Sequence, residues 1–513
     1  MASRTGDSDN KEKTEKSPFA GFLSYFYGNF VVLLLGFIQT PIVTRIMSTD
    51  EFGRTGMFET AVTIIYIFAI LGLDQAYIRF YYTEGVNRAR LLKKCLMPAL
   101  CIVSVLSVIY GLNSDFFNDL LFKRSASDIT ALVIIYTLIS VFERFFFLDV
   151  RMQQNGKLYS NINITEKVLS ILTIVAAWYF LGNDFRVALY ALAVPWGITT
   201  AFLVVRYAYL YKKGRLQLYP EGQTEQDKEA LSDEKTATTV VNADGEIPYS
   251  ELIKYGLPFI VVLLMEWILS SCDRVALRIW SSFEEMGIYG SAMKIIILLL
   301  TFKNTFIAWW SPVAMERFEK RPMEENREFF RKAYDLTQYL CVCAAAGLIL
   351  FRKVIVLILG SDYRNSERMI PFLTLMPIFA MMFEITVQSI KYSKKNIYLN
   401  LASLFAIAVN ICGNFYLVPR LGGTGAALTT GVSYLIYFAA GSYFSEKCIK
   451  IGYSYKKTFI YAVLLLLYCA YASFAENAVL DACFGLVLIG FACVFDRYSL
   501  GVCLGYIKKF LKH

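Results

Sequence analysis

The feature that most constrains the fold is a series of apolar runs, each of about 20 residues, that recurs along the whole chain. A run of this length crosses the roughly 30 Å hydrocarbon core of a bilayer as a helix, because lipid offers backbone polar groups no partner outside the segment. The hydrophobic fraction of 56% and the mean hydropathy of +0.47 indicate an all-α polytopic membrane protein. Fourteen runs lie near 21–46, 56–78, 91–112, 129–150, 160–182, 186–211, 250–278, 287–312, 333–358, 368–390, 396–418, 422–445, 456–475 and 478–496.

Two short motifs recur in the same order in the two halves of the chain. The sequence EFGRTG at 51–56 returns as EMGIYG at 285–290, and KLYSN at 157–161 returns as NIYLN at 396–400. Single matches of this kind also arise by chance, so the stronger sign is that six successive spans repeat with a similar shift. We therefore expect two related six-helix lobes.

The repeat divides the chain into lobes, a linker and tails. Because each lobe has six spans, both lobes run in the same direction through the bilayer, and we expect a pseudo-two-fold axis along the membrane normal with a cavity between the lobes. The predicted parts are a disordered cytoplasmic tail at 1–20, a first lobe at 21–211, a polar cytoplasmic linker at 212–249, a second lobe at 250–445, two extra helices at 456–496 and a cytoplasmic tail at 497–513.

The charged and reactive residues predict an orientation and exclude several functions. Lysine and arginine concentrate in the loops on the side of the N-terminus, so both termini are expected to be cytoplasmic, and the net charge of +9 reflects topology and not nucleic-acid binding. The single histidine is His513, and the eleven cysteines have no metal-ligand spacing. We expect no metal, no cofactor and no enzyme activity, since the outer loops are too short for a catalytic site.

Longer motifs occur in a characteristic order in both halves. They are EFG at 51–53, LGL at 71–73 and IRF at 78–80, then YGLP at 255–258, Trp267, Asp273-Arg274, GIY at 287–289, AW at 308–309 through Pro312, and LVPRLGGTGAA at 417–427. In this order they resemble the bacterial polysaccharide and O-unit flippases. That family belongs to the multidrug/oligosaccharidyl-lipid/polysaccharide exporter superfamily, with the lipid II flippases and the multidrug and toxin extrusion antiporters.

The resemblance implies a function and a location. It implies that an undecaprenyl-pyrophosphate-linked oligosaccharide moves from the cytoplasmic to the outer leaflet of the bacterial inner membrane, for O-antigen or other cell-envelope polysaccharides, with membrane lipids and other polysaccharide-assembly proteins as partners. It also implies that the two extra helices hold the prenyl tail, with simple packing as the alternative reading.

Ionisable residues inside the spans are the candidate site, because a charge in the membrane normally faces water or a partner. Arg144 and Arg151 are seven residues apart in the fourth span, Lys167 lies in the fifth, Lys294 in the eighth and Glu266 in the seventh. Arginine and lysine hold a pyrophosphate with charge-assisted hydrogen bonds, so we expect these residues to line the cavity. Ion pairing of the cations with Glu143 or Glu166 is the structural alternative.

Asp273 and Arg274 lie near the outer end of the seventh span, where they form either an ion pair or a gate between the lobes. Coupling to H⁺ or Na⁺ at Glu59, Glu143 or Glu266 and transport driven by the membrane potential both stay open. The alternative function is a cation-coupled multidrug or small-molecule antiporter of the same superfamily. Such antiporters often depend on an acid in the first span, and residues 21–46 contain neither Asp nor Glu.

Overall fold

The computed structural model describes residues 18–83, 86–124, 126–153, 155–213, 246–475 and 477–510. Within these ranges the chain is helical without strands, which confirms the all-α prediction. The helices are α1 (Pro18–Ile46), α2 (Thr49–Ile70), α3 (Leu73–Phe80), α4 (Arg88–Leu112), α5 (Ser114–Phe122), α6 (Ser127–Met152), α7 (Gly156–Leu181), α8 (Arg186–Lys212), α10 (Tyr249–Trp280), α11 (Phe283–Lys320), α12 (Met323–Ile355), η1 (Val356–Ile358), η2 (Ser361–Arg368), α13 (Ile370–Thr386), α14 (Gln388–Tyr392), α15 (Ile397–Cys448), α16 (Tyr455–Phe474), α17 (Ala478–Phe495) and α18 (Arg497–Phe510).

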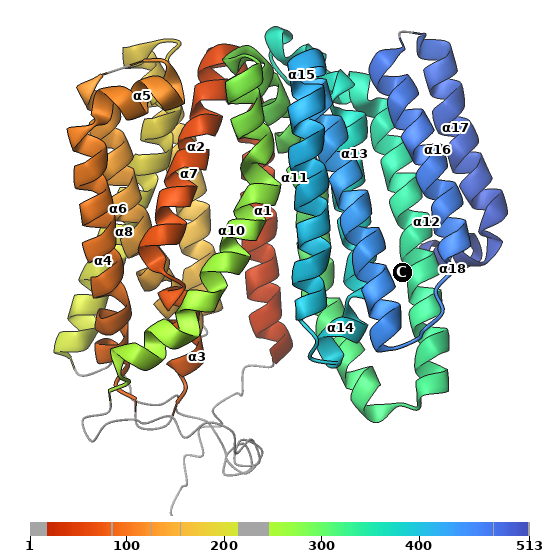
Figure 1. The fold of residues 1–513 in the computed structure, drawn as a ribbon, viewed down its shortest axis with the longest axis horizontal. Helices are drawn as coiled ribbons and strands as arrows, with labels where there is room; N and C mark the ends of the chain where they lie inside the picture. The colour runs from red at the N-terminus through yellow and green to blue at the C-terminus, as the bar shows by residue number, and fades with distance from the viewer. Residues whose placement is uncertain are drawn as a thin grey trace, which may run out of the picture.

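Many of these helices are long enough to cross a membrane, and most run along one common direction (Figure 1). In the described residues, ten helices meet the length and hydropathy of a span, or up to twelve if each of two bent pairs is one span. The pairs are α2 with α3, bent by 53°, and η2 with α13, bent by 59°. The chain is therefore a multi-pass membrane protein.

The predicted span at 56–78 is broken where α2 meets α3. Leu71 (φ 52°) and Gly72 (φ 67°) adopt left-handed backbone, which ends the first helix and redirects the chain. A Cβ on Gly72 would also lie 2.1 Å from the carbonyl oxygen of Gly256 in α10. Position 72 therefore requires glycine both for its backbone angle and for the close approach of α10.

The long helix α15 contains two of the predicted spans, 396–418 and 422–445. Its backbone leaves helical geometry at Gly422 (φ 53°, ψ −133°). A Cβ on Gly413 would lie 2.6 Å from Cγ2 of Thr429, whereas an unbroken helix would separate the two residues by about 24 Å. The chain therefore doubles back at Gly422, and the two halves of α15 pack against each other as antiparallel helices.

The helices gather into two groups with a third at one side (Figure 1). In the first group, which we call the N-lobe, α1, α2, α4, α6, α7 and α8 pack together; in the second, the C-lobe, α10, α11, α12, α13 and α15 do so. The lobes meet where α2 packs on α11 and where α10 packs on α2 and α3. The side chains of α2, α10 and α11 thus face the boundary between the lobes.

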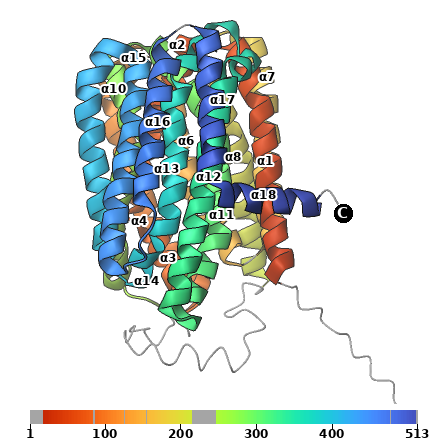
Figure 2. The same ribbon diagram turned by 90° about the vertical axis from the view of Figure 1, so that its right-hand side faces the viewer.

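The third group consists of α16, α17 and α18, which pack beside α12. Arg352 of α12 is only 1% exposed, and its guanidinium donates to Oδ2 of Asp481 at 2.7 Å and to the carbonyl oxygen of Ala472 at 2.8 Å. The ion pair with Asp481 of α17 and the hydrogen bond to Ala472 of α16 together attach both extra helices to the C-lobe. Residues 497–510 of the predicted tail form α18, which runs across the direction of the other helices (Figure 2).

The two copies of the repeated motif open α2 and α11 in the same way. The hydroxyl of Ser48 accepts from the N–H of Glu51 at 3.4 Å, and that of Ser282 from the N–H of Glu285 at 3.1 Å, so each serine caps its helix. The Glu51 carboxylate then accepts from the N–H of Phe185 before α8, and Glu285 from that of Gly423 in α15, both at 2.8 Å. Each motif therefore joins the start of its helix to a later helix of its own lobe.

Two differences from the predicted layout concern the segments between spans. The predicted loop between the third and fourth spans contains α5, and the predicted span at 287–312 is the middle of the longer α11. Most of the predicted tail at 1–20 and of the predicted linker at 212–249 lies outside the described residues.

Candidate functional site

Four charged side chains from four helices meet at the boundary between the lobes. Glu59 of α2 lies 3.4 Å from Nη1 of Arg274 of α10, and it interacts electrostatically with Lys294 of α11 and Lys167 of α7 as well. Lys167 and Lys294 also interact with each other. We call Glu59, Lys167, Arg274 and Lys294 the central cluster. It combines three cations and one acid, with two residues from each lobe.

The central cluster lies near the middle of the bundle. We name the end of the bundle at which α1 ends and α2 begins the outer end, after the predicted orientation. At 1.5 Å per residue, Glu59 and Lys294 lie about 15 Å along their helices from that end. Lys294 is exposed, and the side chains of Arg274 and Glu59 are 25% and 33% exposed. Space therefore remains beside these charges for a ligand or water.

Arg144, another predicted cavity residue, lies deeper in the N-lobe. Its Nη2 lies 2.5 Å and its Nε 3.1 Å from Oδ2 of Asp74, which follows the break between α2 and α3. The arginine side chain is 36% exposed, whereas Asp74 is 3% exposed. The break thus turns a buried carboxylate toward Arg144, and the cation keeps one open face.

Two acids lie between the central cluster and Arg144. Glu143 of α6 interacts electrostatically with Glu166 of α7, and Glu166 accepts from the hydroxyl of Thr199 at 2.7 Å. The phenol group of Tyr136 interacts electrostatically with both acids and with Glu59. Polar groups therefore continue through the N-lobe from the central cluster toward Arg144.

The remaining predicted cavity residues lie apart from this group. Arg151 is exposed in the last turn of α6. Glu266 is exposed on α10, where it interacts electrostatically with Tyr434 and Tyr437 of α15. Arg151 is thus placed at the inner end of the N-lobe and Glu266 beside α15 of the C-lobe, while Lys167 and Lys294 belong to the central cluster and Arg144 pairs with Asp74.

Asp273 and Arg274 face different surroundings. Asp273 is 2% exposed inside the C-lobe, where its carboxylate accepts from the hydroxyls of Tyr289, at 2.6 Å, and Thr430. The amides of Asn410 and Asn414 donate to its other oxygen at 3.1 and 2.8 Å. Asp273 therefore links α10, α11 and both halves of α15, whereas the ion pair of Arg274 is with Glu59 across the lobe boundary.

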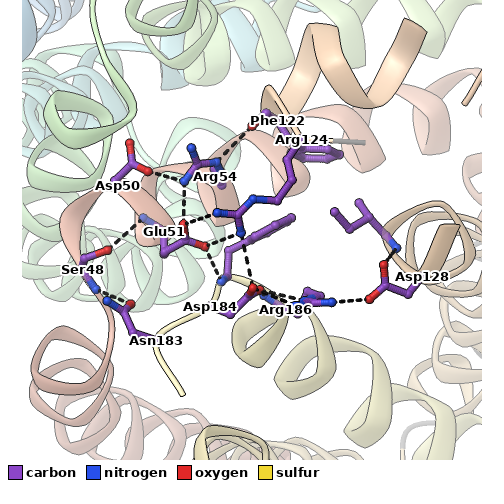
Figure 3. A network of polar contacts seen from close by, with 12 residues as sticks. Ser48, Asp50, Glu51, Arg54, Phe122, Arg124, Asp128, Asn183, Asp184 and Arg186 are labelled. Carbon is purple, nitrogen blue, oxygen red and sulfur yellow. Dashed lines mark hydrogen bonds and ion pairs between the residues drawn. The ribbon is translucent and has the colours of Figure 1, made fainter. Parts of the chain in front are cut away.

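The outer end of the boundary between the lobes is closed by polar contacts. Figure 3 shows Glu51, which is 6% exposed, between Arg54 and Arg124 at 2.7 and 3.2 Å. From the C-lobe, Arg278 donates to the carbonyl oxygens of Asp119 and Leu121 at the end of α5, at 3.1 and 3.3 Å. The two arginines Arg54 and Arg278 also lie over the ring of Phe283, 4.6 and 5.1 Å from its centre.

Asp184 belongs to the same outer network, in the loop between α7 and α8. Burial acts to raise its pKa, but hydrogen bonds from the side chain and N–H of Arg186, together with the charges of Arg186 and Arg124, lower the pKa overall. The Arg186 guanidinium also bonds Asp128 at 2.5 Å (Figure 3). The carboxylate form of Asp184 therefore stabilises the outer end of the N-lobe.

Sequence reasoning did not assign Asp74, Asn410, Asn414 or Thr430 to a site. The sequence contained a hint in two of these regions. Asp74 lies two residues after Gly72 within one apolar run, and Asn410 and Asn414 are four residues apart within another apolar run. Polar side chains four apart share a helix face, which points to one common partner. That the partner is Asp273 could not be read from the sequence.

Residues 19–316, more than half of the chain, match the family described as polysaccharide biosynthesis protein. The chain belongs to this family. Over 96% of its length it is 21% identical to an uncharacterized membrane protein of Methanocaldococcus jannaschii, MJ1068, of which 95% is covered.

Solved structures share the fold of this polysaccharide biosynthesis protein. The lipid II flippase MurJ in an inward closed conformation matches with a TM-score of 0.62 at 14% identity, over 93% of this chain and 99% of that one. An inward-facing multidrug resistance MATE transporter of the MOP superfamily matches with a TM-score of 0.52 at 17% identity, over 85% and 99%. The helical arrangement is thus that of known membrane flippases and transporters.

Proposed function

We propose that the protein is a flippase that moves an undecaprenyl-pyrophosphate-linked oligosaccharide from the cytoplasmic to the outer leaflet of the bacterial inner membrane. The observation that carries the proposal is the central cluster, in which Lys167, Arg274 and Lys294 come from both lobes to a common partner, Glu59, in the middle of the bundle. A pyrophosphate is a compact polyanion and matches such a group of cations. Membership of the polysaccharide biosynthesis family supports a glycan as the rest of the substrate.

We further propose that transport occurs by alternating access between two lobes related by a pseudo-two-fold axis. The matched caps of Ser48 and Ser282 and the matched carboxylate contacts of Glu51 and Glu285 support the repeat. With α1 as one span, each bent pair as one and α15 as two, the chain would have the predicted fourteen spans. The contacts at the outer end agree with a state that opens toward the cytoplasm.

In this mechanism the headgroup enters between the lobes from the inner end, where Arg144 and the exposed Arg151 attract its phosphates. It then reaches Lys167 and Lys294, while the prenyl tail stays in the lipid beside α16 and α17. Separation of the contacts around Phe283 would open the outer end. Both chain termini are assigned to the cytoplasmic side by this orientation.

Coupling to a cation is proposed at Asp273. The carboxylate is buried among oxygen-bearing side chains, and Oδ1 of Asn414, which is also buried, has no hydrogen-bond partner in the described residues. Binding of Na⁺ requires the hydroxyls and amides, which donate to the carboxylate in this structure, to turn their oxygens toward the ion, whereas binding of a proton requires no such ligands. The same feature favours the second candidate function, a cation-coupled small-molecule antiporter.

The test is complementation in bacterial strains that each lack one defined glycan-lipid flippase, with the lipid-linked intermediates identified by mass spectrometry. We expect the protein to restore export in one of the strains and to clear its accumulated intermediate. A variant with Lys167, Arg274 and Lys294 all changed to Gln should reach the membrane but restore nothing. Drug resistance in a pump-deficient strain, without complementation in any flippase strain, would favour the antiporter instead.

A further inference from the structure

The central cluster contains an acid that a site for a polyanion does not need. Glu59 is a common electrostatic partner of Lys167, Arg274 and Lys294. Three positive charges and one negative charge leave a net formal charge of +2. An acid at this position weakens the attraction for a pyrophosphate, so its presence requires a role of its own.

We propose that Glu59 is a resident counter-ion that holds Arg274 until the anionic headgroup displaces it, and that the exchange releases a bridge between the lobes. The inference rests on the proposed function and adds to it a means by which the substrate starts the movement. The substrate class is a lipid with a pyrophosphate headgroup.

The geometry of the bridge suits an exchange. Nη1 of Arg274 and Oε2 of Glu59 are 3.4 Å apart, longer than the 2.7–2.9 Å typical of strong charge-assisted hydrogen bonds. Both side chains are partly exposed, at 25% and 33%. A phosphate group can take two parallel bonds from a guanidinium and bring more charge, so it outcompetes a single long contact.

The bridge joins parts that must separate or turn during transport. Glu59 is on α2 of the N-lobe and Arg274 on α10 of the C-lobe. About two turns closer to the start of α10, Nε1 of Trp267 donates to the carbonyl oxygen of Thr60 on α2 at 3.3 Å. A ligand that removes Glu59 from Arg274 leaves this bond as the neighbouring polar link, and the difference in contacts biases the lobe equilibrium.

The lysines explain why displacement is favourable. Lys167 and Lys294 repel each other, and Cε of Lys167 lies 3.5 Å from the position of a Cβ on Gly36, which shows how closely α1 confines it. A pyrophosphate brings about two negative charges into this space, where Glu59 brings one. The larger anion therefore balances the three cations better than the resident carboxylate does.

The test measures binding of farnesyl pyrophosphate to the full chain in nanodiscs. E59Q is expected to bind this probe roughly five-fold more tightly than the wild type, since a competing charge is lost. E59D keeps the charge, but its side chain is one methylene shorter and reaches Arg274 less well, so it should also bind the probe more tightly. It keeps the test valid if E59Q does not fold. E251Q has the same change of charge at the inner end of α10 and should leave affinity within about two-fold.

A second readout follows the lobes directly. Hydrogen exchange of α2 and α10 in the wild type is expected to rise when the probe is added, and E59Q without probe should already exchange at the higher rate. Equal or weaker binding by both E59Q and E59D would overturn the counter-ion role while leaving the flippase proposal in place. If the wild type binds the probe no better than R274Q/K294Q, the proposed function itself fails.

Discussion

Gly53 and Gly287 occupy matching points where α2 crosses α11, and each lies against the backbone of the other helix. A Cβ on Gly53 would be 2.0 Å from the carbonyl oxygen of Phe283, and one on Gly287 would be 1.8 Å from that of Thr49. Both glycines are the third residue of the repeated motif. The duplicated sequence thus supplies a close backbone contact between the lobes at the outer end.

Substitution of either glycine is therefore expected to force the lobes apart at the outer end. G53A and G287A should each lower the free energy of unfolding by about 1–3 kcal/mol, because the backbone must shift to admit the methyl group. Thermal unfolding of the purified protein measures the loss. G347A is the control, since a Cβ on Gly347 of α12 meets nothing within 4 Å; equal stability of G53A and the control would contradict the packing argument.

Two roles of Arg144 can be distinguished by experiment: contact with the substrate, and neutralisation of the buried Asp74 carboxylate alone. We expect R144Q to lower glycan export at least about ten-fold while membrane insertion is kept, because a phosphate contact of this kind is worth 1.5–3 kcal/mol. The double variant R144Q/D74N, which removes both charges, should stay equally inactive. Recovery of export in the double variant would show that Arg144 only neutralises Asp74.

Neutralising Lys294 tests the central cluster on the C-lobe side. K294Q is expected to abolish most export, since the exposed ammonium faces Glu59 and Lys167 across the boundary between the lobes. K303Q, on the same helix, is the matched control and should retain export. Export by K294Q at the wild-type rate, measured in the complemented strain, would remove Lys294 from the site.

Asp273 is expected to make stability depend on the cation. Melting temperature should be higher in NaCl than in choline chloride of equal ionic strength, because a bound ion stabilises the folded state by mass action. D273N should lose this difference, while D119N, at an exposed position on α5, should keep it. The same sodium response in D273N would exclude the carboxylate as the binding group.

The buried pair of Arg352 and Asp481 should be essential for attachment of the extra helices. R352M leaves an unpaired carboxylate at a buried position, and loss of one partner from such a pair costs about 3–5 kcal/mol. R352M/D481L should recover most of that stability. Limited proteolysis between α16 and α17 and thermal unfolding together report the detachment.

The lowered pKa of Asp184 predicts a pH dependence. A carboxyl group whose pKa is lower in the folded state stabilises the protein above its unfolded pKa of about 3.9, and the stabilisation is lost as pH falls through the folded value. D184N should therefore be less stable than the wild type at pH 7, and the gap should shrink as pH falls below about 4. A gap that does not change with pH would contradict this assignment.

Much of the fold could be predicted because helix formation in a membrane is a local requirement. The apolar runs at 91–112 and 456–475 correspond to α4 and α16, since each run must satisfy its own backbone hydrogen bonds. The break after Leu71 and the helix α5 were not predicted. They depend on contacts with distant segments, such as the approach of Gly256 to Gly72.

The site could be predicted only in part for the same reason. Lys167 and Lys294 were identified because a charge within an apolar span raises the free energy of insertion and therefore indicates a functional role. Their meeting with Glu59 depends on how α7 and α11 pack across the two lobes, and neither spacing nor composition contains that information. Asp273 and Arg274 show the limit most directly, because these neighbours in sequence have different hydrogen-bond and ion-pair partners, one inside the C-lobe and one across the lobe boundary.

By itself, the sequence determined that this protein spans a membrane many times, that a motif opening a helix is duplicated, and which residues carry charge within the spans. Only the tertiary structure decided which of those charges meet, that α15 doubles back at Gly422, and that Asp74 turns toward Arg144. The physical reason is range: hydrophobicity and helix capping act within about one span of the chain, whereas pairing of charges requires helices brought together by packing from distant parts of the sequence.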